Sequence, residues 1–247
     1  MRIRDYRAKA RQLLAGKWGM AILVTFVASL FGALLVGSGA SFNISIDESF
    51  LEFVPERLQN ILLYYITIVG SIAGLLGMAQ FILSGVVQLG YSKYLLKLHD
   101  GEDADIKDLF SQFNRFGDGF LLSLLTSIYT FLWTMLFIIP GIVAAYKYAM
   151  APFLMLENPD MSASDAITAS KHLMKGHKAA LFGLDLSFLG WSLLATLFTL
   201  GIGHLWLNPY RNVARASFYR NLRPLQIAEP VVEQIPTETF QTPYWQR

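Results

Sequence analysis

A nearly uncharged stretch at residues 119–156 limits the possible folds of this chain more than any other feature, because it holds a single charged residue. A bilayer core is about 30 Å thick and is crossed by about 20 apolar helical residues. Residues 120–139 are long enough for one span, and residues 142–156 can return as a second, shorter one. Pro140 and Gly141 lie between them and favour a tight turn. The stretch therefore predicts a membrane hairpin; one long helix kinked at the proline is the alternative.

Four further runs of the chain are apolar enough to be membrane spans. Overall, 54% of the residues are hydrophobic and only 15% are charged, and the charged residues lie in blocks between these runs. This composition is typical of an integral membrane protein. The four runs are 19–39, 58–92, 182–200 and 204–219, of which the last is short and contains a proline. Together with the hairpin they predict six spans.

The first run also has features of a secretory signal, because the small residues Ser38 and Ala40 lie at its end. Its apolar part is longer than the core of a usual signal peptide, and further spans follow it. We therefore expect a retained signal-anchor, with a cleaved signal as the alternative.

Three polar segments outside the spans repeat apolar residues every three or four positions, as amphipathic helices do. In residues 1–18 six basic residues accompany this pattern, which is typical of a helix on an anionic membrane surface. An ordinary positive flank of the first span is the alternative. The second segment lies within 93–118; the third follows Pro159, where Ser162 and Asp165 fit a capping box. The three apolar faces are Ile3, Tyr6, Leu13, Leu14 and Trp18; Ile106, Leu109, Phe110, Phe113 and Phe116; and Ile167, Ser170, Leu173 and Met174.

The positions of the basic residues predict the orientation of the chain. All but two of the 20 Lys and Arg residues fall in residues 1–18, in the 93–118 and 157–178 loops or on the carboxy-terminal side. The exceptions are Arg57, in an acidic loop, and Lys147, within a span. Cytoplasmic loops are enriched in Lys and Arg, so both termini are expected in the cytoplasm.

The chain also resembles itself at fixed separations. LLAGKWGMAIL at 13–23 resembles LMKGHKAALFG at 173–183, and residues 121–142 match 181–202 at a constant offset. Each unit would be a surface helix followed by two spans, and every unit would start on the same side. The sequence thus predicts an all-α polytopic membrane protein whose six transmembrane helices form three parallel-repeat hairpins, each preceded by an amphipathic interfacial helix.

The predicted domain organisation has three parts. Residues 1–18 form a basic amphipathic interfacial helix, residues 19–222 form the six-span membrane domain, and residues 223–247 form a disordered cytoplasmic tail. The tail is expected to be irregular because four prolines interrupt the chain after Leu222.

Several sequence motifs resemble a bacterial membrane family catalogued as domain of unknown function nine-seven-five. They are GKWGMAIL, LGYSKYLLKL with GED, DLFSQFNRFGDG, IIPGI, LENPDMSASDAITASKHLMKGHK, and LGIGHLWLNPY with FYRNL. The resemblance covers about residues 5–222. The chain is also distantly similar to the membrane domain of some glycerophosphodiester phosphodiesterases. These resemblances imply a polytopic protein of the bacterial cytoplasmic membrane without established catalytic residues.

No pattern in the chain is typical of an enzyme. There is no cysteine, and the four histidines form no metal-binding motif. His172 and His177 lie five residues apart, on different faces of a helix. No Gly-rich phosphate loop or Gly-x-Ser-x-Gly motif is found. We therefore expect no catalytic activity, no metal, no cofactor and no nucleic-acid partner.

Four ionisable residues within the predicted spans are the candidate site: Asp185, Arg211, Arg215 and Lys147. A charge in hydrocarbon costs several kcal/mol unless it is paired or reaches water. At 1.5 Å per helical residue, Asp185 and Arg215 both lie about 10 Å from the cytoplasmic edge. Asp185 can thus pair with Arg215, or with Arg211 nearer the middle. The alternatives are a structural ion pair and a site for an anionic lipid headgroup or peptide. Lys147 is expected to extend to the outer interface.

Two functional classes agree with these features. The first is a non-enzymatic membrane protein that organises lipid or a partner protein, where the partner is another membrane protein or a second copy of the chain. The second is a small transporter or channel with a polar site between the fifth and sixth spans. The three predicted surface helices and the scarcity of polar residues in the spans favour the first.

Overall fold

The computed structural model describes residues 2–32 and 55–228, and every regular element among them is a helix. The helices are α1 (Ile3–Leu14), α2 (Trp18–Leu30), α4 (Glu56–Asp100), α5 (Lys107–Phe110), α6 (Phe116–Leu136), α7 (Ile138–Tyr148), α8 (Ala151–Glu157), α9 (Ala163–Leu173), α10 (Lys178–Thr199) and α11 (His204–Ala228). A short 3₁₀ turn, Phe113–Arg115, precedes α6. The expected acidic outer loop, the small residues Ser38 and Ala40, and the last part of the tail lie outside the described residues.

Four helical segments of the described residues are long and apolar enough to cross a membrane. A fifth results if α1 and α2, which meet at an angle of 104°, form one broken span. The four segments are Leu63–Asp100, Lys107–Leu136, Ile138–Glu157 and Lys178–Thr199. The expected sixth span, α11, is not among them because polar and basic residues interrupt its apolar sequence. A membrane protein is thus supported, whereas the six-span count stays a prediction.

The central hairpin is present, but its turn lies earlier than expected. Phe137, with φ −160° and ψ 149°, is extended and separates α6 from α7. The prediction of a turn at Pro140 and Gly141 is wrong, because both residues lie inside α7. Pro140 fits the first helical turn, where an amide hydrogen has no intrahelical partner. A Cβ on Gly141 would lie 2.1 Å from Oγ1 of Thr134, so glycine permits α6 and α7 to pack closely.

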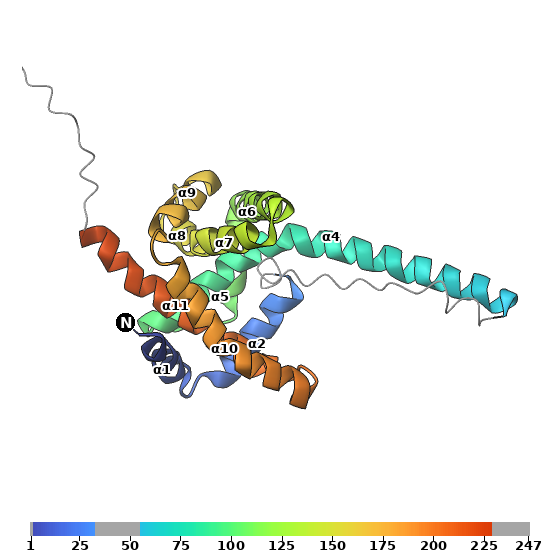
Figure 1. Ribbon diagram of the computed structural model, residues 1–247, viewed down its shortest axis with the longest axis horizontal. Coiled ribbons are helices and arrows are strands. Elements are labelled where there is room, and N and C mark those ends of the chain that lie inside the picture. The colour runs from blue at the N-terminus through green and yellow to red at the C-terminus, as the bar shows by residue number, and fades with distance from the viewer. Residues whose placement is uncertain (1, 33–54, 229–247) are drawn as a thin grey trace, which may run out of the picture.

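The predicted amphipathic helices differ in their outcome. Helix α1 buries Tyr6, Ala10 and Leu14. It packs against α11, where the ring of Tyr6 lies 5.4 Å from that of Phe218 (Figure 1). Ile3, in contrast, stays exposed. The amphipathic pattern of α1 therefore reflects packing within the protein at least in part.

The third amphipathic helix is confirmed as α9. Its predicted apolar face is buried, and the amide nitrogen of Asp165 donates to Oγ of Ser162 at the N-cap. The second is wrong as a continuous helix. Helix α4 continues to Asp100, and the segment that follows contains only the four-residue α5 and the 3₁₀ turn. Within it Leu109 is buried, whereas Phe110 and Phe113 are exposed.

Helix α4 links the core to an exposed extension. Its 45 residues correspond to about 68 Å, more than twice the hydrocarbon thickness. The carboxy-terminal half buries Val86, Leu89 and Tyr94 in the helix bundle. The amino-terminal half projects away from the bundle (Figure 1), and its large apolar side chains are exposed.

Helix α11 is longer than the sequence suggested. It continues to Ala228 and so enters the segment expected to be irregular after Leu222. Pro209 and Pro224 both lie within this helix. The prediction that prolines end regular structure at residue 222 is therefore wrong for residues 223–228.

Candidate functional site

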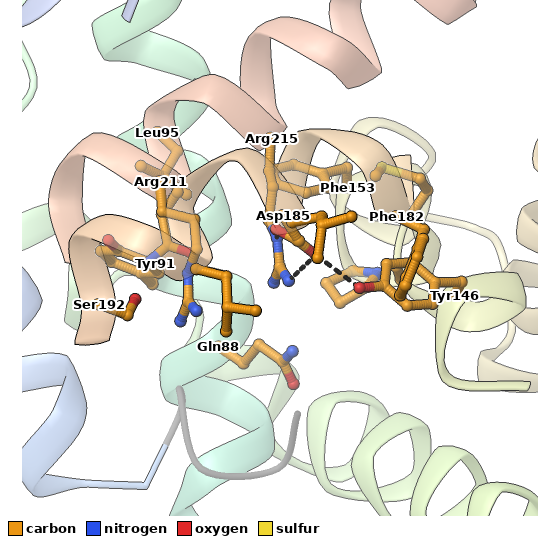
Figure 2. A pocket seen from close by; sticks show the side chains of 16 residues that line it. Gln88, Tyr91, Leu95, Tyr146, Phe153, Phe182, Asp185, Ser192, Arg211 and Arg215 are labelled. Carbon is orange, nitrogen blue, oxygen red and sulfur yellow. Dashed lines mark hydrogen bonds and ion pairs between the residues drawn. The ribbon is translucent and has the colours of Figure 1, made fainter. Parts of the chain in front are cut away.

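A cavity of about 580 Å³ lies between α4, the α7–α8 pair, α10 and α11. Its volume is within the range typical of small-molecule sites. The wall combines polar side chains from α4, α7, α10 and α11 with apolar ones from α4, α8 and α10 (Figure 2). The lining residues are Gln88, Tyr91, Leu95, Tyr146, Ala149, Met150, Pro152, Phe153, Phe182, Asp185, Leu186, Leu189, Ser192, Arg211, Asn212 and Arg215.

Asp185 of α10 and Arg215 of α11 form a two-point ion pair in this wall. Nε of Arg215 donates to Oδ1 of Asp185 at 2.9 Å, and Nη2 donates to Oδ2 at 2.5 Å. The Asp185 side chain is only 12% exposed. Two parallel N–H···O bonds fix both groups in one orientation. Of the two partners that the sequence left open for Asp185, Arg215 makes the contact.

Tyr146 of α7 completes the coordination of the carboxylate. Its hydroxyl donates to Oδ2 of Asp185 at 3.0 Å, from the side opposite Arg215 (Figure 2). Three hydrogen bonds thus reach the two carboxylate oxygens from two other helices. A buried charge with this many partners is held firmly in place.

A local break in the chain follows Tyr146. Helix α7 ends at Tyr148, and Pro152, which has no amide hydrogen, lies at the start of α8. Ser170 of α9 satisfies the polar backbone groups at the break. Its hydroxyl donates to the carbonyl of Lys147 at 2.8 Å and accepts from the amide of Met150 at 3.2 Å. Helix α9 therefore helps to fix the wall that carries Tyr146.

Arg211, one turn before Arg215 on α11, also lines the cavity but pairs with no carboxylate among the described residues. Its Nε is inaccessible to solvent and has no hydrogen-bond partner in the described part of the chain. The side-chain amide nitrogen of the neighbouring Asn212, Nδ2, is also inaccessible to solvent and has no hydrogen-bond partner among the described residues. In Figure 2 the Arg211 guanidinium points into the space near Gln88, away from the Asp185 pair. The cavity wall thus carries two guanidinium groups and one carboxylate.

Helix α4 supplies the remaining polar wall. The hydroxyl groups of Tyr91 and Thr25 are 3.0 Å apart in a buried hydrogen bond that ties α2 to α4. Gln88 lies one turn earlier on the same helix and lines the cavity. Tyr91 and Gln88 lie on the side of the cavity where Arg211 is found (Figure 2).

Lys147 lies apart from the other three predicted site residues. It is not among the lining residues, and its Nζ lies 5.0 Å from the ring centroid of Trp133 on α6. This is a cation–π contact between the two helices of the hairpin. The structure therefore brings Asp185, Arg211 and Arg215 together and places Lys147 elsewhere.

The sequence reasoning missed Tyr91, Tyr146 and Asn212, because it searched the spans for charged side chains only. Tyr91 and Tyr146 could have been found as hydroxyl-bearing residues within or beside uncharged runs. A buried tyrosine hydroxyl usually needs a hydrogen-bond partner. No group of three His, Asp or Glu residues in the described part of the chain could hold a metal ion.

Comparison with known protein families gives one match. A family model described as "Protein of unknown function (DUF975)" matches residues 1–146 and, in an overlapping second match, residues 135–226. No curated protein and no solved structure matches the chain. The expected similarity to the membrane domain of glycerophosphodiester phosphodiesterases therefore finds no support in these comparisons.

Proposed function

The chain belongs to the family of proteins of unknown function DUF975, and from this premise we propose that it is a non-enzymatic integral membrane protein that organises lipid or a partner protein. We further propose that the cavity between α4, α7–α8, α10 and α11 binds an anionic group of the ligand. Its expected location is the bacterial cytoplasmic membrane, with both termini in the cytoplasm.

The observation that carries this proposal is the unpaired state of Arg211. A guanidinium in a membrane domain is costly unless it has a counter-charge or reaches water. The nearest carboxylate, Asp185, is already engaged by Arg215 and Tyr146. A phosphate or carboxylate bound in the cavity would accept from the Arg211 guanidinium and balance the excess positive charge of the wall.

The apolar side of the cavity favours an amphiphile as the ligand. Phe153, Phe182, Leu186 and Leu189 line it beside the charged groups. A lipid has both an anionic headgroup and apolar chains, so it matches this mixed wall. Because Arg215 and Tyr146 already bind Asp185, no free carboxylate among the described residues lines the cavity to act as a general base, and we therefore propose binding instead of catalysis.

The test is thermal unfolding of the purified protein with a short-chain anionic lipid. Dihexanoyl phosphatidic acid should raise the unfolding temperature, and dihexanoyl phosphatidylcholine should raise it less. At a ligand concentration 100 times Kd, binding stabilises a protein by about 2.7 kcal/mol. Arg211→Gln should remove most of this stabilisation. Lys147→Gln is the matched control, because it removes a cation of the membrane region outside the cavity and should keep the effect.

The ligand-free variant provides a second readout. If Arg211 serves ligand binding, Arg211→Gln without lipid should be at least as stable as the parent protein, because an unpaired charge has been removed. A large loss of stability in the absence of lipid would instead indicate a structural role for Arg211 and would contradict the proposal.

A small transporter is the second candidate. Its support is that Gln88 and Ser192 add uncharged polar groups to the cavity wall, as a solute pathway requires. Purified protein in proteoliposomes should then move an anion such as glycerol phosphate at a rate that Arg211→Gln lowers. Lipid-dependent stabilisation without any such flux favours the binding function.

A further inference from the structure

A second hollow, on another face of the molecule, combines an apolar wall with two basic side chains. This groove has a volume of about 600 Å³ and lies between α1, the start of α2, and the adjoining ends of α10 and α11. It shares no lining residue with the cavity around Asp185. The residues that line the groove are Arg7, Arg11, Trp18, Trp191, Leu194, Ala195, Phe198, Thr199, Gly203, Trp206, Leu207 and Tyr210.

The basic wall of the groove comes from α1. Arg7 and Arg11 are one helical turn apart, so both lie on the same face. Neither forms an ion pair with a carboxylate of the described residues, as the eight ion pairs found there involve other groups. Asp5, the acidic residue of α1, accepts instead from the backbone amide of Arg2 at 2.8 Å. Within the described residues, the two guanidiniums thus have no carboxylate partner.

Contacts with the helices beneath hold this wall in position. Cζ of Arg7 lies 5.3 Å from the ring centroid of Phe188 on α10. The hydroxyl of Tyr210 on α11 donates to the carbonyl of Arg7 at 3.1 Å. Trp18 packs against Tyr210 with the ring centroids 6.4 Å apart. The groove therefore has a preformed basic wall, because tertiary contacts restrict Arg7.

The opposite wall is apolar and open. Trp191, Phe198 and Trp206 are 56%, 76% and 53% exposed. Helix α10, which carries two of them, is one of the candidate membrane spans. In a membrane this wall faces lipid chains, and Trp is the side chain that prefers the zone between lipid headgroups and chains.

We propose that this groove binds an anionic glycerophospholipid, with the phosphate between Arg7 and Arg11 and one acyl chain along the tryptophans. Charge complementarity supports this occupant, since the unpaired guanidiniums attract a phosphate that a purely apolar partner lacks. The apolar wall next to them matches the chain of the same molecule. The inference depends on the membrane location of α10 but not on any ligand in the Asp185 cavity.

Tryptophan fluorescence offers a direct test. Three of the five tryptophans, Trp18, Trp191 and Trp206, line the groove, so Trp133→Phe with Trp245→Phe leaves only these as reporters. Purified protein of this background is titrated with brominated phosphatidylglycerol or brominated phosphatidylcholine, which quench nearby indoles. Phosphatidylglycerol should quench at a lower mole fraction. Arg7→Gln with Arg11→Gln should weaken its apparent affinity by about 30-fold, because each basic residue contributes a factor of about five.

A matched variant separates a site from general charge attraction. Arg4→Gln with Lys9→Gln removes the same charge from two positions of α1 that do not line the groove, of which Arg4 is exposed and Lys9 is half-buried. It should retain the preference for phosphatidylglycerol. Because Arg7 also contacts Phe188, Arg11→Gln alone serves as a variant with less risk to folding and should show part of the loss.

Three results would overturn the proposal. Equal quenching by both lipids would show that bulk lipid fills the groove without selection. An equal loss in the Arg4/Lys9 variant would assign the preference to net charge. Absence of quenching, together with a dimer in size-exclusion chromatography, would indicate that a second copy of the chain occupies the groove. Each of these results leaves the Arg211 experiment unaffected, so the two proposals can fail separately.

Discussion

Thr25 and Asp185 occupy matching positions in two similar helix pairs, and each forms a hydrogen bond with a tyrosine hydroxyl at 3.0 Å. They are 160 residues apart (185 − 25), the same separation as Gly16 and Gly176 (176 − 16), which have φ of +76° and +83°. Each glycine lies between a surface helix and an apolar helix, α1–α2 and α9–α10. The glycine turns and the tyrosine contacts have the same offset as the two sequence units, and the repeat itself stays a prediction. The two sites differ in charge, because only Asp185 attracts an arginine.

The Asp185–Arg215 pair predicts a coupled effect of mutation. Asp185→Asn alone should lower the free energy of unfolding by about 3 kcal/mol, because Arg215 is left without its counter-charge. Asp185→Asn with Arg215→Gln should recover part of this loss. Thermal unfolding in detergent measures both. The double variant Asp185→Asn with Arg211→Gln is the control, and its effect should equal the sum of the two single effects; additivity in both double variants would contradict the pairing.

Tyr146→Phe tests the third partner of Asp185. The variant keeps the ring but removes the hydroxyl that donates to the carboxylate. A hydrogen bond to a charged group contributes about 1.5–3 kcal/mol, so Tyr146→Phe should lower the free energy of unfolding by about that amount. Tyr129→Phe is the matched control, because Tyr129 is more exposed and makes a ring contact with Tyr148. An equal loss in both variants would show that the Asp185 contact has no special weight.

Charge within apolar sequence was the signal that singled out the three charged residues of the cavity wall. Asp185, Arg211 and Arg215 could be assigned to the candidate site from the sequence, because a charged side chain is costly in hydrocarbon and therefore needs a partner. The same argument failed for Lys147, whose long side chain reaches an aromatic ring on a neighbouring helix. Tyr146 could not be assigned, because nothing in its local sequence shows which helix will face it.

Helix boundaries were harder to predict than helices. Pro140 was expected to mark the turn, but proline is also favoured in the first turn of a helix, and the break is at Phe137. Pro209 and Pro224 likewise lie within α11. Tertiary packing decided these cases, since Gly141 lies against Thr134 and α11 packs on α1, α2, α4 and α10. Such contacts between helices cannot be predicted from the local sequence.

The predicted orientation can be tested with single cysteines, because the chain has none of its own. Ser45→Cys should react with an impermeant maleimide in intact cells, whereas Ser111→Cys and Thr237→Cys should react only after lysis. The reason is the Lys and Arg asymmetry of the loops. Ile138→Cys should behave like Ser45→Cys, because Ile138 adjoins the turn between α6 and α7, which the predicted orientation places outside. If Ser111→Cys or Thr237→Cys were labelled in intact cells while Ser45→Cys was protected, the predicted topology would be wrong.

Arg220 of α11 predicts a third electrostatic effect, because it joins the ends of two other helices. Its Nη1 donates to Oε1 of Glu157 on α8 at 2.5 Å, and its Nη2 pairs with Asp100 at the end of α4. Glu157 also accepts from Tyr219 and Arg223 and is only 10% exposed, whereas Asp100 is 33% exposed. The burial of Glu157 makes it the central acceptor of this cluster.

Glu157→Gln should therefore destabilise the protein by about 3 kcal/mol, because it leaves two arginines without their buried acid. Asp100→Asn should cost less than about 1 kcal/mol, as is usual for an exposed pair. Thermal unfolding at low and high salt distinguishes the two, since salt screens the exposed Asp100 contact more strongly than the buried one. If the two substitutions lowered the free energy of unfolding equally, the contacts of Arg220 with Asp100 and with Glu157 would contribute equally to stability. That result would contradict the prediction from the difference in burial.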